Sequence, residues 1–153
     1  MNTSMTKNER EAFLSEVRVG VISIPEDGRG PLAVPVWYLY EPGGDVRVWT
    51  GSQTRKAALL RAAGRASLCV QEPTSPYKYV SIEGPLKIEA VDFERDVRPL
   101  AYRYFGPEMG EQYLEMVGGR EGVATDILVR ITPERWLTVD YSKLNSEGSA
   151  QES

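Results

Sequence analysis

The sequence contains no histidine and one cysteine among its 153 residues. Without histidine, the chain can form neither a Ser-His-Asp or Cys-His catalytic group nor a histidine-ligated zinc or haem site. One cysteine, Cys69, excludes an intramolecular disulfide and a cysteine-rich metal site, and favours a reducing compartment. Because Cys69 lies in a strand-like segment, we expect it to be a small buried hydrophobic residue.

Long apolar runs and excess positive charge are also missing. No run approaches the roughly 18 apolar residues of a membrane-spanning helix, and the N-terminal segment MNTSMTKNEREAF lacks the apolar core of a signal peptide. The net charge of −4 argues against nucleic-acid coating, which needs a positive surface to replace counterions. We therefore expect a cytoplasmic protein without a membrane span or a nucleic-acid partner.

The remaining composition is that of an ordinary globular domain, with 41% hydrophobic and 26% charged residues. We expect one domain over residues 1–145 and a disordered polar tail over 146–153. A T-x-x-E capping box at Thr6 and Glu9 predicts the first helix. The expected helices are 7–17, 55–63 and two between 92 and 117, and the expected strands are 18–24, 31–40, 45–50, 65–71, 77–91 and 123–141.

Turn-rich segments divide these strands. The connections 25–30 and 41–44 have hairpin length, which predicts a mainly antiparallel sheet. Pro35 inside 31–40 cannot donate to a ladder, so this segment is an edge strand, a bulge or a strand with one open side. Gly84-Pro85 and Thr132-Pro133 predict a bend or break in the later strands. About six or seven twisted strands with flanking helices suggest a small barrel, mainly β.

The segment 45–70 is the most informative for chemistry. A strand ends at Thr50, a Gly-Ser turn follows, and a helix begins with two cations, Arg55 and Lys56. Cations are disfavoured in a first helical turn, whereas the free N–H groups there attract anions. Together with the hydroxyls of Ser52 and Thr54, this pattern is compatible with a phosphate site, whereas the simpler interpretation of this segment alone is a solvated helix end capped by Thr54.

Two further segments, PVWYLY at 35–40 and SPYKYVSIEG at 75–84, contain aromatic residues. Pro35, Val36 and Trp37 could form a flat wall for a planar ring, or only barrel core. Tyr79 and Ser81 fall on one polar face of a strand, which could line a cleft or a dimer seam. Asp126 has no identifiable acid/base partner, and the run ERDVR at 94–98 is most simply a solvated helix face.

Taken together, these segments resemble the split β-barrel flavin- and deazaflavin-binding proteins, the pyridoxamine-5′-phosphate-oxidase-like superfamily. The resemblance covers about residues 7–141 and is carried by RVGVISI, PLAVPVWYLY, VRVWT-GSQTRKAALLRAAGRASLCV and the later strand with VSIEG. It implies an antiparallel split barrel and a homodimer with two cofactor sites at the subunit interface.

The resemblance also implies a cofactor, either FMN or the deazaflavin coenzyme F-420. Carried over by position, Thr50, Ser52, Arg55 and Lys56 match the residues that hold the cofactor phosphate. Pro35, Val36 and Trp37 match the strand along the ring system, and Tyr79 and Ser81 lie on the strand that faces the cleft.

The missing histidine distinguishes between the branches of this superfamily. True pyridoxamine phosphate oxidases have a longer chain with a basic C-terminal segment and substrate-binding His and Arg, whereas this chain ends in DYSKLNSEGSAQES. The short form resembles the F-420-binding branch of actinobacteria, which implies an oxidoreductase that transfers hydride to a small organic acceptor. An FMN-binding oxidoreductase and a non-enzymatic cofactor-binding protein are the alternatives.

Overall fold

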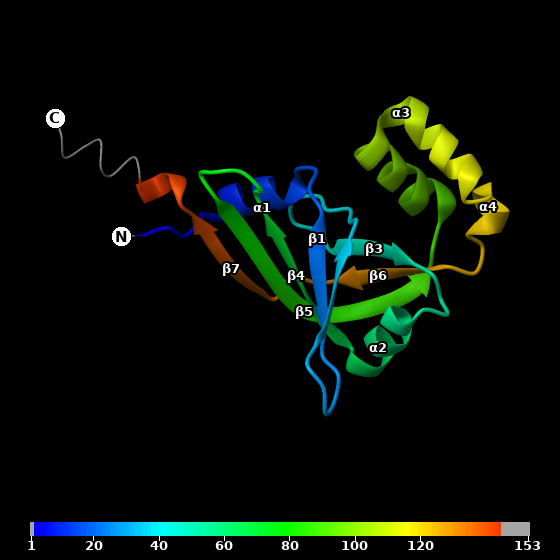
Figure 1. The fold of residues 1–153 in the computed structure, drawn as a ribbon, viewed down its shortest axis with the longest axis horizontal. Coiled ribbons are helices and arrows are strands. Elements are labelled where there is room, and N and C mark those ends of the chain that lie inside the picture. The colour runs from blue at the N-terminus through cyan, green and yellow to red at the C-terminus, as the bar shows by residue number, and fades with distance from the viewer. Residues whose placement is uncertain (1, 145–153) are drawn as a thin grey trace.

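Seven antiparallel strands build the fold in the computed structural model, which describes residues 2–144. The strands follow the order β2-β1-β4-β5-β6-β3, and β7 pairs with β5 (Figure 1). This arrangement with its flanking helices confirms the expected split barrel. The expected tail, 146–153, lies outside the described residues. The strands are β1 (Gly20–Ile24), β2 (Leu32–Val36), β3 (Val46–Thr50), β4 (Arg65–Gln71), β5 (Lys78–Ala90), β6 (Ile127–Ile131) and β7 (Arg135–Asp140).

The long strand β5 joins the two halves of the sheet. Its first half pairs with β4 and β7, and its second half pairs with β6. The change of partner falls at Gly84, where an added Cβ would lie 1.8 Å from the carbonyl oxygen of Thr132. The predicted bend at Gly84-Pro85 is therefore the point where β5 changes its partner strands. Figure 1 shows that β5 is a long, curved strand.

The helices begin and end largely where the sequence predicts. Thr6 and Glu9 form the capping box of α1 (Lys7–Ser15), which is two residues shorter than expected. Thr54 caps α2 (Arg55–Ala63), and Gly64 ends it in the left-handed conformation with φ 68°. Beyond β5 the chain forms a π-helical turn, η1 (Phe93–Val97), then α3 (Arg98–Met116) and the short α4 (Gly119–Gly122).

The sequence predicts that Pro99 kinks or breaks the helix that follows Asp92 and that Gly106-Pro107-Glu108 starts a new one. Pro99 does not break the helix, because it lies in the first turn of α3, where its missing N–H is harmless. The break lies at Gly106, with φ 79° and ψ 172°, directly before Pro107, as the predicted restart of the helix requires. The last strand also begins later than expected, because α4 and the following loop occupy residues 119–126.

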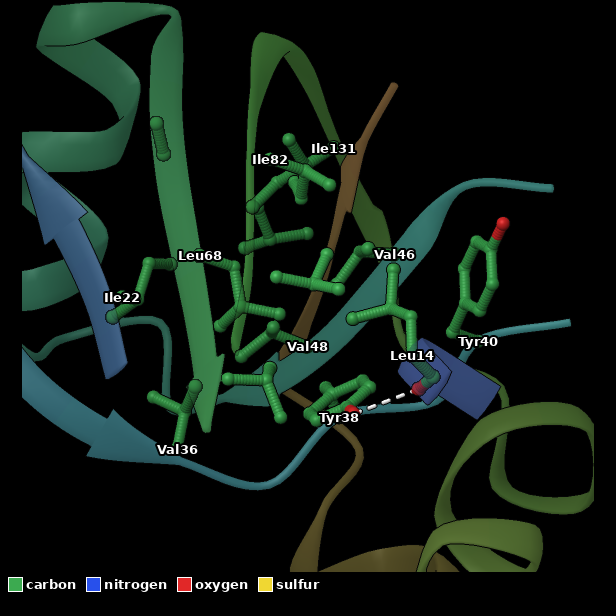
Figure 2. Packing of buried hydrophobic residues seen from close by; sticks show 14 of the residues in the cluster. Leu14, Ile22, Val36, Tyr38, Tyr40, Val46, Val48, Leu68, Ile82 and Ile131 are labelled. Carbon is green, nitrogen blue, oxygen red and sulfur yellow. Dashed lines mark hydrogen bonds between the residues drawn. The ribbon is translucent and has the colours of Figure 1, made fainter. Parts of the chain in front are cut away.

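The hydrophobic core brings together side chains from α1 and from strands β1 to β6 (Figure 2). Its largest fully buried side chain is Tyr38, whose hydroxyl donates a 2.7 Å hydrogen bond to the carbonyl of Leu14 near the end of α1. The neighbouring carbonyls of Ser15 and Glu16 accept hydrogen bonds from Arg103 of α3. The C-terminus of α1 is thus fastened by side chains from elsewhere in the chain.

Tyr38 gives the protein a predicted weakness at alkaline pH. Burial raises the pKa of Tyr38 to about 12, whereas an unfolded tyrosine titrates near about 10. The folded state therefore binds more protons between these values, and stability falls as pH rises, by up to about 1.4 kcal/mol per unit. Tyr38→Phe should remove this slope and cost about 1–2 kcal/mol at neutral pH.

Denaturant unfolding at pH 8 to 12 measures both effects. Tyr77→Phe is the matched control, because Tyr77 is 55% exposed. Equal slopes in Tyr38→Phe and wild type would refute the role given to the Tyr38 hydroxyl.

The structure overturns two expectations about burial. Cys69 is exposed, because its buried neighbours Leu68 and Val70 take the inward positions of β4. Asp96 and Val97 of the ERDVR run are fully buried, so this run is not a solvated helix face. Asp96 accepts hydrogen bonds from Arg47 of β3, from Arg95 and from the backbone N–H of Asp92.

This ion network fastens the helical segment to the sheet. Burial alone would raise the pKa of Asp96, but hydrogen bonds from Arg95 and Asp92 and the nearby guanidinium groups lower it overall. Arg47 also donates a hydrogen bond to the carbonyl of Arg95. In an α-helix this carbonyl would pair with the N–H of residue 99, which Pro99 lacks.

Within the described residues no helix is long and apolar enough to cross a membrane.

Candidate functional site

A cavity of about 350 Å³ lies between β2, the end of β3 and α3. Its size falls within the range of small-molecule sites. Five of the residues selected from the sequence line it: Pro35, Val36, Trp37, Thr50 and Lys56. Sequence reasoning missed the others, which are Val19, Trp49, Gly51, Leu100, Tyr113 and Asp126.

Lys56 is the one cation among the lining residues. Its side chain is half-buried at the start of α2, and it makes no hydrogen bond or ion pair within residues 2–144. Burial lowers the pKa of the Lys56 ammonium, because desolvation disfavours its charged form. A half-buried ammonium without a protein partner, next to the free N–H groups of a helix start, is suited to bind an anion.

Aromatic side chains form a second part of the lining. The Trp37 ring stacks on Tyr104 of α3 at a centroid distance of 5.0 Å and an interplanar angle of 14°. Phe105 and Tyr113 contact Trp37 edge-on, at 5.2 and 5.9 Å. These contacts fix the indole against α3, so that the cavity has a rigid apolar wall rather than a mobile side chain.

The cavity is also lined by a carboxylate, that of Asp126. The Trp49 indole N–H donates a 2.9 Å hydrogen bond to Oδ2 of Asp126, which directly precedes β6. Tyr113 also lines the cavity, and burial raises the pKa of its hydroxyl, which keeps it protonated at neutral pH. The cavity therefore contains an ammonium, a carboxylate and a phenol among large apolar surfaces.

The other four candidate residues lie outside this cavity. Arg55 forms a 2.7 Å ion pair with Glu26 of the β1–β2 connection, and the carbonyl of Ser52 accepts a hydrogen bond from Arg61. Tyr79 and Ser81 lie on β5, opposite Gln71 and Cys69 of β4. Their assignment to a cofactor site stays a prediction.

The outward face of β2, β1, β4, β5 and β7 is unusually apolar. Strand register places Pro35, Val21, Cys69, Ser81 and Leu137 in one row across it. Val21 is 40% and Leu137 62% exposed. A second cavity of about 940 Å³ lies on this face, and it shares Val19 and Pro35 with the first. The two cavities therefore adjoin along β1 and β2.

The antiparallel split barrel, with a cavity suited to an anion beside its third strand, defines the structural class of the protein. Residues 6–140 match the family described as pyridoxamine 5′-phosphate oxidase. The chain belongs to this family, because the match covers most of its length. No curated protein matches the chain.

Solved structures give the same fold. A conserved hypothetical protein from Mycobacterium tuberculosis has a TM-score of 0.74 and 25% identity, over 94% of this chain and 89% of that one. An F420 reductase has a TM-score of 0.68 and 18% identity, over 83% of this chain and 94% of that one. A FAD-binding protein from Mesorhizobium loti has a TM-score of 0.62 and 20% identity, over 88% and 94%.

Proposed function

We propose that the protein is an F-420-dependent reductase that binds the deazaflavin in the 350 Å³ cavity and serves hydride transfer to a small organic acceptor. The observation that carries this proposal is Lys56, a half-buried ammonium without a protein partner among the described residues. An anionic group of a ligand would supply the counterion that the half-buried Lys56 ammonium lacks.

The residues present fit a cofactor with a planar ring and an anionic arm. Trp37 and Val36 offer flat and aliphatic surface to a ring, and Lys56 offers charge to the arm. At Gly51, an added Cβ would lie 3.3 Å from Cγ2 of Thr54, so a side chain there would crowd the turn that precedes α2. These features match the chemistry of a flavin or deazaflavin, which supplies a ring that carries hydride when bound.

The chain's own residues need only bind, orient and shield. Lys56 holds the anionic arm, and the stacked pair of Trp37 and Tyr104 fixes one wall of the ring site. Leu100 and Tyr113 of α3 exclude water from another side. The protonated Tyr113 hydroxyl can donate a hydrogen bond or a proton to a ligand in the cavity. No histidine or cysteine nucleophile is required.

FMN is the second candidate, since its ring system has the same shape and the family includes flavin-binding proteins. The neighbour named as an F420 reductase favours F-420. The absence of histidine argues against pyridoxamine-phosphate oxidation, whose enzymes use a substrate-binding His, and does not distinguish F-420 from FMN. A protein that binds the cofactor without turnover would use the same cavity. An electron-poor alkene, an imine or a quinone would be a suitable acceptor, taking a hydride from the ring and a proton from Tyr113 or solvent.

A titration of the purified protein with each cofactor tests this function. We expect F-420 to bind at one molecule per chain, with its absorbance near about 420 nm, and FMN, near about 450 nm, to bind more weakly. Reduced F-420 should be reoxidised only when protein and acceptor are both present. Failure of both cofactors to bind would refute the proposal, and binding without reoxidation by any acceptor class would favour the non-enzymatic alternative.

The apolar outer face supports a homodimer, the form in which proteins of this family commonly occur. In the row of residues from Pro35 to Leu137, the exposed residues Val21 and Cys69 lie opposite each other on β1 and β4. Exposed apolar surface of this kind marks an association site. A second copy on this face would cover the 940 Å³ cavity and bring its own residues to the edge of the cofactor cavity. Tyr79 and Ser81 would then lie at the subunit seam.

Val21→Asp should therefore dissociate the protein. A carboxylate at the middle of a buried apolar interface costs several kcal/mol unless it is paired, so we expect a monomer in light scattering after size exclusion, together with weaker cofactor binding. Ser23→Asp, two residues along the same strand face, is the control near the polar border with Ser67. A Val21→Asp protein that remains dimeric would exclude this face as the interface.

A further inference from the structure

Asp126 is a second charged residue of the cofactor cavity, and only one of its two carboxylate oxygens has a protein partner. The Trp49 indole N–H donates its 2.9 Å hydrogen bond to Oδ2. Among residues 2–144 no donor pairs with Oδ1, and no arginine or lysine forms an ion pair with this carboxylate. An ionised carboxylate oxygen accepts hydrogen bonds and donates none. Oδ1 is therefore an open acceptor in the wall of the cavity.

The backbone and the Trp49 contact hold this carboxylate in place. The N–H of Asp126 donates to the carbonyl of Val123 at 2.9 Å, and its carbonyl accepts from the N–H of Val91 at 3.3 Å. An added Cβ at Gly51 would lie 4.0 Å from Oδ1, so a side chain at this position would occupy the space beside that oxygen. Glycine leaves this space free, directly before the turn that leads into α2.

We propose that Oδ1 of Asp126 accepts a hydrogen bond from a hydroxyl group on the linker between the cofactor's ring and its anionic arm, so that the cavity selects ligands with a polyol linker. This inference rests on the proposed function, because that function places the ring against Trp37 and the arm at Lys56. It adds a protein contact for the segment of the ligand that joins the two.

The position of Asp126 decides which group of the ligand Oδ1 accepts from. The ionised arm that Lys56 binds has no hydrogen to donate, so the donor lies on the linker or on the ring. Asp126 adjoins Gly51, which directly follows β3 and lies shortly before Lys56, whereas Val36 and Trp37 at the end of β2 form the wall for the ring. The open acceptor therefore lies on the side of the arm, which favours a linker hydroxyl over a ring N–H.

The test compares two ligands that share the deazaflavin ring and a terminal phosphate. One has a ribityl linker with its hydroxyl groups, and the other has a pentyl linker without hydroxyl groups. Dissociation constants for both are measured by fluorescence titration at neutral pH, with wild type, Asp126→Ala and Asp27→Ala. Asp27→Ala is the matched control, because Asp27 is exposed and does not line this cavity.

We expect wild type and Asp27→Ala to bind the ribityl ligand at least about tenfold more tightly than the pentyl ligand, the effect of one hydrogen bond to a carboxylate. Asp126→Ala should lower this ratio at least about fivefold. If Asp126→Ala does not fold, Asp126→Asn replaces it, because the amide oxygen can still accept from Trp49 while the NH₂ group takes the place of Oδ1. The ratio should then fall at least about threefold, since a bond to a neutral group is about half as strong.

A smaller fall in the ratio would overturn the role of Asp126. This includes an equal loss of affinity for both ligands, which a contact with a ring N–H would cause. A wild-type protein that does not prefer the ribityl ligand, although it binds F-420, would also overturn it and would leave the proposed function standing. If wild type binds neither of these ligands nor F-420, the proposed function itself fails, and this inference fails with it.

Discussion

Lys56→Ala is expected to weaken cofactor binding by about 10- to 150-fold, the equivalent of one charge-assisted hydrogen bond of about 1.5–3 kcal/mol. Stability should hardly change, because the ammonium has no protein partner within residues 2–144 and its burial is itself unfavourable. A fluorescence or calorimetric titration with F-420 measures the affinity, and a thermal melt measures the stability.

Lys87→Ala is the matched control for this variant. Lys87 is exposed on β5 and does not line the cavity, so its loss removes the same charge without removing a ligand contact. Because burial lowers the pKa of Lys56, the affinity of wild type should also decline at alkaline pH before an ordinary lysine loses its proton. Equal affinities of Lys56→Ala and Lys87→Ala would contradict the anion site.

Asp96→Ala is expected to destabilise the protein by about 3–5 kcal/mol, because it leaves the largely buried guanidinium group of Arg47 without its counterion. The Arg47 side chain is only 15% exposed and donates a 2.9 Å hydrogen bond to Asp96. Nε of Arg95 also donates a hydrogen bond to Asp96, at 2.9 Å. This network joins β3 to the segment that begins α3. Its loss should therefore also loosen Leu100 and Tyr113 at the cavity and weaken cofactor binding.

Denaturant unfolding compares this variant with Glu134→Ala. Glu134 pairs with Arg65 on the surface, where both side chains are 49% exposed, so its loss should cost no more than about 1 kcal/mol. The pKa of Asp96 is lower in the folded than in the unfolded protein, where it is about 3.9. The stability that Asp96 contributes is therefore fully present above that unfolded pKa, and it is lost as the pH falls through the lower folded pKa. Similar losses in both variants would refute the network's role.

Local signals in the sequence were sufficient for most of the fold. Thr6 with Glu9, and Thr54 with Gly64, mark helix ends by interactions that span only a few residues. Pro35 predicted an edge strand, a bulge or a strand with one open side, and β2 lies at one end of the strand order. The misplacement of Cys69 was avoidable, because the alternation of Leu68 and Val70 already assigns it to the other face.

Contacts between distant segments account for what sequence reasoning missed at the site. Asp126 meets Trp49 only because β3 and β6 pair, with Thr50 opposite Ile127. Asp96 of η1 is paired in its buried position by Arg47 of β3, a residue 49 positions away that the charged run around Asp96 does not reveal. Tyr113 enters the cavity because Gly106 breaks α3 and folds its second half back toward Trp37.

A crystal structure of the protein with bound F-420 tests the central claim most directly. The account predicts the cofactor's ring against Pro35, Val36 and Trp37, and a negatively charged group of its arm within hydrogen-bonding distance of the Lys56 ammonium. Density for the cofactor elsewhere on the molecule, or a Lys56 side chain turned away from it and paired with a protein carboxylate, would contradict the account.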